Sequence, residues 1–296
     1  MKAQALTGTY TALVTPFTDD QLDVAAFKKL IQLQIRARVD GIVPVGTTGE
    51  SPTLDYAEHL EVIRLAVKFA GGKLKVMAGT GGNSTKEAIY LTREAEQIGA
   101  DASLQVAPYY NKPTQEGLFQ HFSAIARATK LPIMLYSIPG RCGVEIAVPT
   151  VQMLAKKHRN IVGIKEAGGN ADRVSQLRQA CGPGFTILSG DDGLTLPFMA
   201  AGASGVVSVA SNVAPREVAQ MVRAFAAGKT QVALALHERL YPLFKNLFVE
   251  TNPAPCKAAL ALLGLCSEEI RLPLVPVTDD TRKLMHATLK QCGLLK

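Results

Sequence analysis

Short apolar runs that return at near-regular intervals constrain the fold of this chain more than any other feature of its sequence. Their centres lie about 20 to 34 residues apart, which is the length of a strand, a helix and the two loops that join them. The runs are continuous rather than alternating, and that pattern is typical of parallel strands covered on both faces. The runs are Tyr10–Val14, Gly41–Val45, Lys75–Gly79, Ala102–Val106, Pro132–Tyr136, Ile161–Lys165, Phe185–Leu188 and Gly205–Val209.

Helical patterns fill the intervals between these runs. The third interval opens with Ser84 and Glu87, which predict a capping box, and Gly99 predicts its end. In the first interval four apolar residues share one helical face: Phe27, Leu30, Ile31 and Ile35. Repeated strand–helix units with right-handed crossovers can close into a (β/α)8 barrel.

An open, doubly wound α/β sheet is the competing fold. Such a sheet usually has about five to seven strands and a glycine-rich first turn. The first turn here, Val14-Thr15-Pro16-Phe17-Thr18, contains no glycine. The sequence therefore predicts an α/β fold of the (β/α)8 TIM-barrel type.

The strand pattern stops after about residue 230, where a C-terminal helical appendage is predicted. Residues 231–248, 256–264 and 278–292 have helical patterns, separated by two proline-rich segments. We therefore expect a barrel catalytic domain at 1–229 and a C-terminal helical domain at 230–296.

Composition excludes several classes of protein. The 47% hydrophobic content excludes a disordered chain. The net charge is +7, but Lys and Arg are scattered and Trp is absent, which favours an ordinary solvated surface over a nucleic-acid-binding patch. No apolar run is long enough to span a membrane, and Met1–Tyr10 lacks the apolar core of a signal peptide. Five cysteines without a C-x-x-C pair make a poor disulfide framework and a poor zinc site, so we expect a cytoplasmic protein.

Lys165 is the strongest candidate for a reactive group. It ends the apolar run Ile161–Lys165, and in a barrel the reactive residues sit at the carboxyl ends of strands. Poor hydration there disfavours the ammonium and lowers the pKa of the amine. A neutral amine can attack a ketone and form a Schiff base. The alternative is a lysine paired with Glu166 or another carboxylate at the rim.

Side chains after neighbouring strands fit the same chemistry. Tyr136 ends the preceding run, where its hydroxyl can shuttle protons to the amine; the alternative is a core ring. Thr47 and Thr48 lie in a glycine-flanked turn that can cradle a carboxylate, or can use its hydroxyls for local hydrogen bonds. Arg141 can bind a second carboxylate, or can be a solvated loop arginine.

Metal and phosphate sites are weakly indicated. Gly79-Thr80-Gly81-Gly82 invites a phosphate-loop interpretation, but no Gly-Lys-Ser/Thr follows. The histidines are dispersed, and Asp191-Asp192 has no obvious partner carboxylates for Mg²⁺. We therefore expect no metal and no cofactor, in agreement with an imine that serves as the electron sink.

Four motifs carry a resemblance that covers essentially the whole chain. They are Gly46-Thr47-Thr48-Gly49-Glu50, Pro108-Tyr109-Tyr110-Asn111-Lys112-Pro113, Tyr136 through Arg141, and Gly163-Ile164-Lys165-Glu166. In this order they resemble the pyruvate-dependent class I aldolase superfamily and, within it, the 4-hydroxy-tetrahydrodipicolinate (dihydrodipicolinate) synthase family. The resemblance implies condensation of pyruvate with L-aspartate 4-semialdehyde on the diaminopimelate route to lysine.

The resemblance also implies a role for each matching residue. Lys165 would form the imine with pyruvate, and Tyr136 would donate and accept protons. Thr47 would link Tyr136 to Tyr110, which would reach in from a neighbouring subunit. The remaining substrate contacts would be Thr48 on the pyruvate carboxylate, with backbone help near Gly190 and Val207, and Arg141 on the semialdehyde carboxylate.

Assembly and regulation are implied in the same way. The family is typically a homotetramer, and many members are inhibited by lysine at a subunit interface. The matching lysine-site positions are Ser51, His59, Gly81, Asn83, Glu87 and Tyr109. Tyr56 and Pro52 differ from feedback-sensitive relatives, which carry His and Ala there, so the resemblance does not extend to the strength of inhibition. Ser137 replaces the commoner Asn.

Two other functions stay open at this point. One is another class I pyruvate aldolase, such as N-acetylneuraminate lyase or a keto-sugar-acid aldolase, which shares the Lys and Tyr but resembles the chain less around Thr47, Thr48 and Arg141. The other is a non-enzymatic barrel that senses pyruvate or lysine. Neither nucleic acid nor a membrane is an expected partner.

Overall fold

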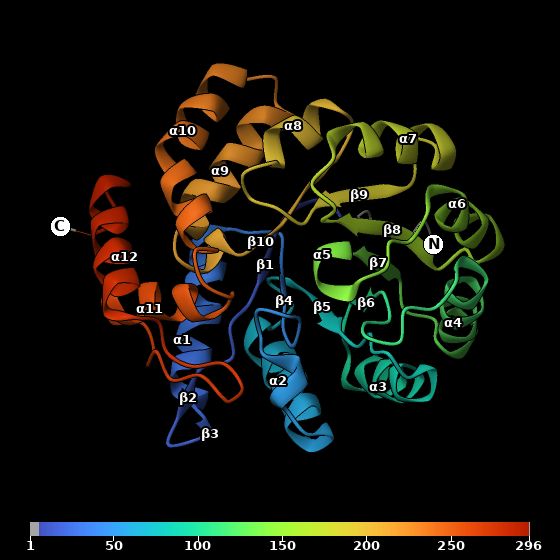
Figure 1. Cartoon of the computed structure of the whole chain (residues 1–296), viewed down its shortest axis with the longest axis horizontal. Helices are drawn as coiled ribbons and strands as arrows, with labels where there is room; N and C mark the ends of the chain where they lie inside the picture. The colour runs from blue at the N-terminus through green and yellow to red at the C-terminus, as the bar shows by residue number, and fades with distance from the viewer. Residues whose placement is uncertain (1–5, 296) are drawn as a thin grey trace.

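The chain folds into a closed barrel of parallel strands surrounded by helices (Figure 1). The structure is a computed structural model and describes residues 6–295. The first five residues of Met1–Tyr10, where the sequence shows no signal peptide, lie outside this range. Around the barrel the strands follow the order β1-β10-β9-β8-β7-β6-β5-β4. The predicted (β/α)8 fold is confirmed.

The barrel strands coincide with the apolar runs of the sequence. Lys75–Gly79 and Ala102–Val106 match their runs residue for residue, and the other strands differ from theirs by one or two positions at one or both ends. Almost every strand residue is buried, because the barrel interior covers one face and helices cover the other. The strands are β1 (Gly8–Ala12), β4 (Gly41–Val43), β5 (Lys75–Gly79), β6 (Ala102–Val106), β7 (Ile133–Ser137), β8 (Ile161–Glu166), β9 (Thr186–Ser189) and β10 (Gly205–Ser208).

Helix ends follow local capping chemistry. Of the two hydrogen bonds of the predicted capping box, only that from Glu87 N–H to Ser84 Oγ, at 3.4 Å, is found among the described residues. Gly99 ends that helix at a φ of 96°. The helices are α1 (Val24–Ala37), α2 (Tyr56–Ala70), α3 (Thr85–Ile98), α4 (Gln115–Ala128), α5 (Pro139–Cys142), α6 (Val148–Lys157), α7 (Ala171–Cys181), α8 (Thr195–Ala200), α9 (Pro215–Ala226), α10 (Thr230–Asn246), α11 (Ala254–Leu262) and α12 (Asp279–Gln291).

The barrel closes between its first and last strands, where two glycines meet. Gly8 lies opposite Gly205 in the parallel register of β1 and β10. Gly205 has a φ of 146°, and a Cβ atom there would lie 1.9 Å from the carbonyl oxygen of Gly8. Only glycine allows both this conformation and this approach of two backbones.

Short elements in the loops do not follow from the sequence pattern. The hairpin strands β2 (Phe17–Thr18) and β3 (Gln21–Leu22) and the one-turn helix α5 are too short to show a hydrophobic period. Two 3₁₀ turns, η1 (Ser51–Thr53) and η2 (Ala210–Asn212), lie after β4 and β10. These elements shape the rim where the strands end.

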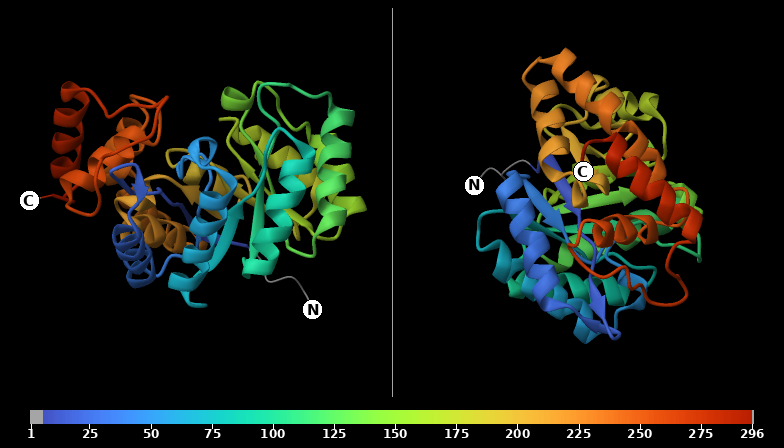
Figure 2. Two further views of the ribbon diagram at one scale, coloured as in Figure 1. Left: turned by 90° about the horizontal axis from the view of Figure 1, so that it is seen from below. Right: turned by 90° about the vertical axis from the view of Figure 1, so that its left-hand side faces the viewer.

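The three predicted C-terminal helices are present as α10, α11 and α12, and α11 and α12 lie at one edge of the molecule (Figures 1 and 2). Several of their buried side chains, among them Leu240, Leu260 and Met285, belong to the same hydrophobic cluster as Ile42 and Val206 of the barrel strands. The appendage therefore shares a core with the barrel, and its division from the barrel at residues 229 and 230 stays a prediction.

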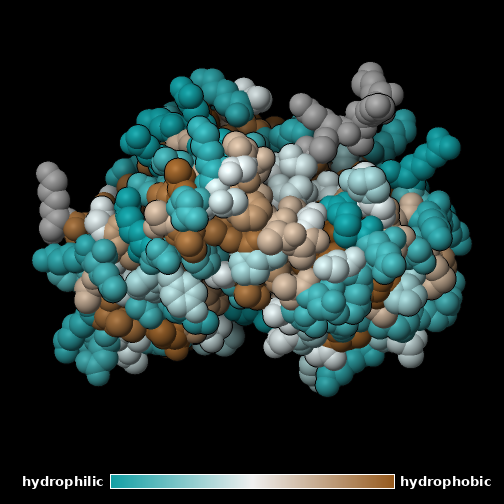
Figure 3. All heavy atoms as spheres, turned by 90° about the horizontal axis from the view of Figure 1, so that it is seen from above, coloured by the Kyte–Doolittle hydropathy of each residue, from teal (hydrophilic) through white to brown (hydrophobic). Residues whose placement is uncertain are grey.

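Hydrophilic side chains cover much of the face shown in Figure 3. On the face shown in Figure 3, hydrophobic groups lie among hydrophilic side chains in several separate places. Within residues 6–295, no helix combines the length and the apolar character that a membrane crossing requires.

Candidate active site

A cavity of about 220 Å³ opens where the carboxyl ends of several barrel strands meet the loops beyond them. Its wall includes apolar side chains of the barrel, such as Val43 and Leu104. The polar groups that the sequence analysis singled out converge on it: Thr47, Thr48, Tyr136, Arg141 and Lys165 all line this cavity. Their positions in the fold are therefore those expected of an active site.

Lys165 projects into the cavity from β8 and is only 6% exposed. The register of β7 and β8 places it beside Tyr136, and its Nζ lies 4.0 Å from the centre of the tyrosine ring. Burial lowers the pKa of the amine to about 7; the Asp192 carboxylate opposes this shift and the Arg141 guanidinium adds to it. A large share of the amine is therefore neutral near pH 7, as a nucleophile must be.

Glu166 does not neutralise Lys165. Successive side chains of a strand point to opposite faces, so Glu166 leaves the cavity and pairs with Arg173, whose Nε lies 2.8 Å from Glu166 Oε2. Gly168 N–H donates to Oε1 of the same carboxylate at 2.7 Å. The alternative in which Lys165 pairs with Glu166 is wrong.

Asp192 is buried near Lys165, and both of its carboxylate oxygens accept hydrogen bonds from the protein. Its carboxylate accepts hydrogen bonds from Ser208 Oγ and from the backbone N–H groups of Val209, at 3.0 Å, and Ala210, at 2.9 Å. Burial raises the pKa of this carboxyl to about 6. Asp192 acts on the electrostatics of the amine and is not arranged to hold Mg²⁺.

Tyr136 is buried against the amine. Burial is the main cause that raises the pKa of its phenol, while Arg141 and a hydrogen bond with the Thr47 side chain act in the opposite direction. The phenol stays protonated near neutral pH and can donate a proton beside the Lys165 amine. Thr47 and Tyr136 are therefore brought together, as the predicted relay requires.

The Gly46–Glu50 turn is closed by its backbone. Gly49 N–H donates to Gly46 O at 3.0 Å and Glu50 N–H donates to Thr47 O at 3.1 Å. The two threonine hydroxyls contact residues outside the turn: Thr47 contacts Tyr136, and Thr48 Oγ1 accepts from Asn252 Nδ2 at 3.0 Å. The alternative in which these hydroxyls serve only the turn itself is wrong.

Arg141 lies at the cavity mouth on the short helix α5. It is exposed yet lines the cavity, and its Nη2 donates to the Asn252 carbonyl oxygen at 3.3 Å. A guanidinium held at the mouth can bind an anionic substrate group there.

The other predicted catalytic and substrate-binding residues lie at different distances from the cavity. Gly190 is adjacent to Lys165, because a Cβ at Gly190 would lie 3.1 Å from Lys165 Cε. Val207 is buried on β10 and is not part of the cavity wall. Tyr110 is 90% exposed and lies outside the cavity of the single chain.

The six predicted lysine-site residues divide into two groups. Ser51, Gly81 and Tyr109 line the same cavity as Lys165. The others lie outside it: His59, Asn83 and Glu87. His59 is buried and its Nε2–H donates to Gly79 O at 2.9 Å, while Asn83 Nδ2 donates to Tyr109 O at 3.2 Å.

Thr80 rules out a phosphate loop after β5. Its hydroxyl is buried and bonds to Thr92 Oγ1 at 2.9 Å and to Ser103 Oγ at 2.8 Å, so it faces the interior. Within the described residues, no group of three or more His, Cys, Asp or Glu side chains is placed to hold a metal ion.

Two residues at the site were not singled out from the sequence. Cys142 lines the cavity, and a lone cysteine without a motif carries no sequence signal of such a position. Asn252 contacts both Thr48 and Arg141, but its segment looked like a proline-rich separator between helices. An asparagine in a linker carries no local signal of a contact with a loop 204 positions away.

The sequence profile of the Dihydrodipicolinate synthetase family matches residues 5–292. The chain belongs to this family. A curated family member from Endomicrobium trichonymphae, named 4-hydroxy-tetrahydrodipicolinate synthase, is 50% identical over 289 residues, which are 98% of this chain and 99% of that relative. The resemblance noted in the sequence is confirmed.

Solved structures of the family agree in fold. The synthase from Methylacidiphilum fumariolicum SolV is 57% identical, with a TM-score of 0.96 over 98% of this chain and 96% of that one. A chloride-inhibited family member from Acinetobacter baumannii, complexed with pyruvate, is 42% identical, with a TM-score of 0.96 over 98% of this chain and 100% of that one.

Proposed function

We propose that this chain is a 4-hydroxy-tetrahydrodipicolinate synthase, a lyase that condenses pyruvate with L-aspartate 4-semialdehyde in the diaminopimelate route to lysine. The observation that carries this proposal is the buried, unpaired Lys165 amine, which lies 4.0 Å from the Tyr136 ring within the described part of the chain. The shared name of close relatives across their full length supports the particular reaction.

Lys165 begins the reaction as a nucleophile. The lone pair of Nζ forms a bond to the keto carbon of pyruvate; Nζ then loses a proton and the carbonyl oxygen takes one up, which gives a carbinolamine. Loss of water then gives the imine. Tyr136 would donate this proton, because its phenol is protonated and its ring lies 4.0 Å from Nζ.

The imine then makes the pyruvate methyl group reactive. Loss of a proton from that carbon gives an enamine, whose carbon forms the new bond to the aldehyde carbon of the second substrate. The aldehyde oxygen takes a proton before cyclisation. Thr47, in contact with Tyr136, extends the path by which these protons move.

Two groups would bind the substrate carboxylates. The Thr48 hydroxyl would donate to the pyruvate carboxylate, with backbone contacts near Gly190 and Val207, and the Arg141 guanidinium at the mouth would bind the carboxylate of the semialdehyde. Both partners would then be held in one cavity, which replaces a two-body encounter with an oriented one.

The exposed Tyr110 supports an oligomeric enzyme. An aromatic side chain that is 90% exposed next to the active-site mouth is suited to enter the relay of a neighbouring subunit through Thr47. We accordingly expect a cytoplasmic homotetramer. Lysine inhibition through Ser51, His59, Gly81, Asn83, Glu87 and Tyr109 stays a prediction.

A coupled assay that supplies pyruvate with different aldehydes tests the reaction. The proposal predicts turnover with L-aspartate 4-semialdehyde and none with N-acetylmannosamine. Cleavage of N-acetylneuraminate or of a keto-sugar acid would instead support another class I aldolase. Pyruvate binding without any borohydride-trapped adduct would support a sensor barrel.

A further inference from the structure

Two contacts join the loop after β4 to the segment that opens α11. Asn252 Nδ2 donates to Thr48 Oγ1 at 3.0 Å, and five residues further on Lys257 forms an ion pair with Glu50. Their partners Thr48 and Glu50 are two residues apart in the loop after β4. The C-terminal helices therefore hold the substrate-binding turn at two neighbouring points.

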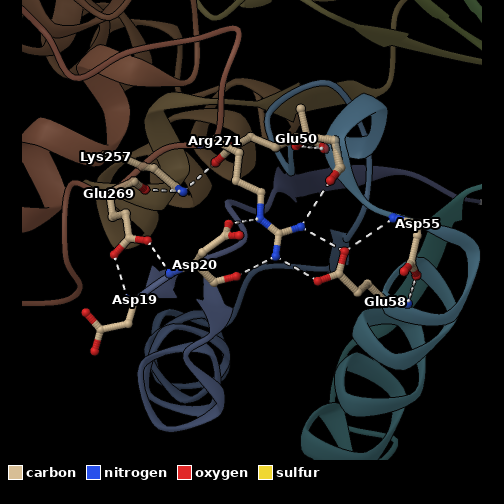
Figure 4. A network of polar contacts seen from close by, with 9 residues as sticks. Asp19, Asp20, Glu50, Asp55, Glu58, Lys257, Glu269 and Arg271 are labelled. Carbon is tan, nitrogen blue, oxygen red and sulfur yellow. Dashed lines mark hydrogen bonds and ion pairs between the residues drawn. The ribbon is translucent and has the colours of Figure 1, made fainter.

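The ion pair anchors the two segments to one another (Figure 4). Lys257 is fully buried, and its Nζ also donates to the carbonyl oxygen of Glu269 at 2.7 Å. Arg271 N–H donates to Glu50 Oε2 at 3.1 Å. A buried ion pair is costly to separate, because either charge would then be left unpaired away from water. Asn252 and Thr48 are thus kept at a fixed spacing.

The Thr48 hydroxyl has its proton free for a ligand. A hydroxyl carries one donor and two acceptor positions, and the Asn252 amide occupies an acceptor position. Within residues 6–295, no acceptor for the Thr48 proton is found, and Thr48 lines the cavity. The proton is therefore available to an anion that enters.

A second Asn–Thr pair in the same helices shows the contrast. Asn246 Nδ2 donates to Thr288 Oγ1 at 2.8 Å, but the Thr288 hydroxyl donates its own proton to Leu284 O at 2.7 Å. That pair is satisfied within the protein. The Asn252–Thr48 pair is left with one unused proton at the cavity.

We propose that Asn252 is a positioning residue that holds the Thr48 hydroxyl as a hydrogen-bond donor to the carboxylate of the keto acid. The inference rests on the proposed function, in which Thr48 binds pyruvate. Asn252 is 4% exposed and is not part of the cavity wall, so it acts through Thr48. The backbone carbonyl oxygen of Asn252 accepts a hydrogen bond from Arg141 Nη2. One residue therefore contacts the groups assigned to both substrate carboxylates.

The unused end of the Asn252 amide fits this role. Oδ1 is buried and has no hydrogen-bond partner among the described residues. An asparagine that served packing alone would be expected to satisfy both ends of its amide, because an unpaired buried acceptor is destabilising. Within residues 6–295, the donation to Thr48 is therefore the one hydrogen bond of this side-chain amide.

The Asn252→Asp variant tests the inference, because a carboxylate has nearly the same shape but can only accept. Thr48 would turn its proton toward the new carboxylate and away from pyruvate. We expect the pyruvate concentration for half-maximal borohydride trapping at Lys165 to rise about tenfold or more. Maximal labelling at saturating pyruvate should stay within about threefold of wild type.

Asn246→Asp is the matched control, since it makes the same change in the Asn246–Thr288 pair. It should leave the half-saturating pyruvate concentration within about twofold of wild type. Asn252→Leu removes the donor without adding a charge, so it serves where the aspartate variant folds poorly, and it should raise half-saturation about threefold or more. In a Thr48→Val background, Asn252→Leu should add no further increase.

The outcomes separate this inference from the function on which it rests. If the wild-type protein is trapped and both Asn252 variants keep its half-saturating pyruvate concentration, the positioning role alone would be overturned. An equal rise in Asn252→Asp and Asn246→Asp would also overturn it, since the effect would then be structural. Absence of trapping in the wild-type protein would overturn the proposed function and the inference together.

Discussion

The contrast between two buried lysines explains the chemistry at the scale of the residue. Lys257 is fully buried and paired with Glu50, so its charge is compensated. Lys165 forms no ion pair within the described residues, and burial lowers the pKa of its amine to about 7. A buried amine without an ion-pair partner is disfavoured in its charged form, and its neutral form is a good nucleophile.

Sequence position sufficed to place Lys165, because strand polarity and side-chain alternation follow from the apolar run that precedes it. The same alternation sends Glu166 to the opposite face, but it does not name the partner there, which is Arg173 on α7. Which face of a strand meets which helix is a tertiary property.

Arg141→Ala tests the electrostatics of the mouth. Removing the guanidinium should raise the pKa of Lys165, because Arg141 helps to lower it, so the pH of half-maximal imine formation should move above about 7. The KM for the semialdehyde should rise about tenfold to a hundredfold through loss of a charge-assisted hydrogen bond.

Steady-state kinetics and borohydride trapping across pH measure these two effects of Arg141→Ala. Arg216→Ala, at an exposed arginine on α9, is the control and should change neither. Equal losses in imine formation at high pH and in use of the semialdehyde would count against the assigned role of Arg141.

At the scale of the element, the barrel strands follow from the sequence because each is a continuous apolar run of ordinary strand length. The hairpin β2–β3 and the helix α5 do not, because two to four residues carry no periodic signal. This matters for function, since α5 carries Arg141 to the cavity mouth.

Gly205→Ala tests the closure of the barrel. The added Cβ would lie 1.9 Å from the Gly8 carbonyl oxygen, and the φ of 146° is unfavourable for any other residue. We expect the free energy of unfolding to fall by about 3 kcal/mol or more, measured by urea denaturation.

Gly184→Ala is the matched control, because a Cβ at Gly184 would meet nothing within 4 Å. Its effect on the free energy of unfolding should be within about 0.5 kcal/mol of zero. A Gly205→Ala protein as stable as Gly184→Ala would show that β1 and β10 do not meet as closely as described.

At the scale of the whole molecule, the C-terminal helices complete the active site as well as the core. The helical patterns in the sequence predict these helices and their approximate boundaries. The contact of Asn252 with Thr48 spans 204 positions, and the sequence around either residue does not indicate it. The residues that such contacts add to a site are therefore visible only in the folded chain.

Acid should destabilise the folded protein through two buried histidines. Burial lowers the pKa of His59 and of His121 from 6.5 to about 4, so the unfolded chain binds protons that the folded chain does not. As the pH falls from about 6.5 toward 4, each histidine thus contributes a loss of about 3 kcal/mol, and the raised pKa of Asp192 offsets part of the total.

Urea denaturation at several pH values measures this loss. His121→Asn should remove the contribution of one histidine, whereas His286→Asn, at an exposed position of α12, should leave the pH dependence unchanged. A pH dependence in His121→Asn that equals that of the wild-type protein would contradict the burial of this imidazole.

Tyr110→Phe tests the expected contribution of a neighbouring subunit. Loss of the hydroxyl should lower kcat about tenfold or more and leave pyruvate trapping at Lys165 largely intact, because the proton relay and not imine binding is impaired. Tyr90→Phe, at another exposed tyrosine, is the control. A wild-type kcat for Tyr110→Phe would remove this residue from the relay.

The identity of the nucleophile is the central claim, and mass spectrometry after treatment with pyruvate and borohydride tests it most directly. We predict one reduced pyruvate adduct, on the peptide that contains Lys165, with labelling that increases as the pH rises through about 7 and disappears in Lys165→Ala. The buried but paired Lys257 should stay unlabelled. An adduct on another lysine, or labelling that persists in Lys165→Ala, would contradict the account.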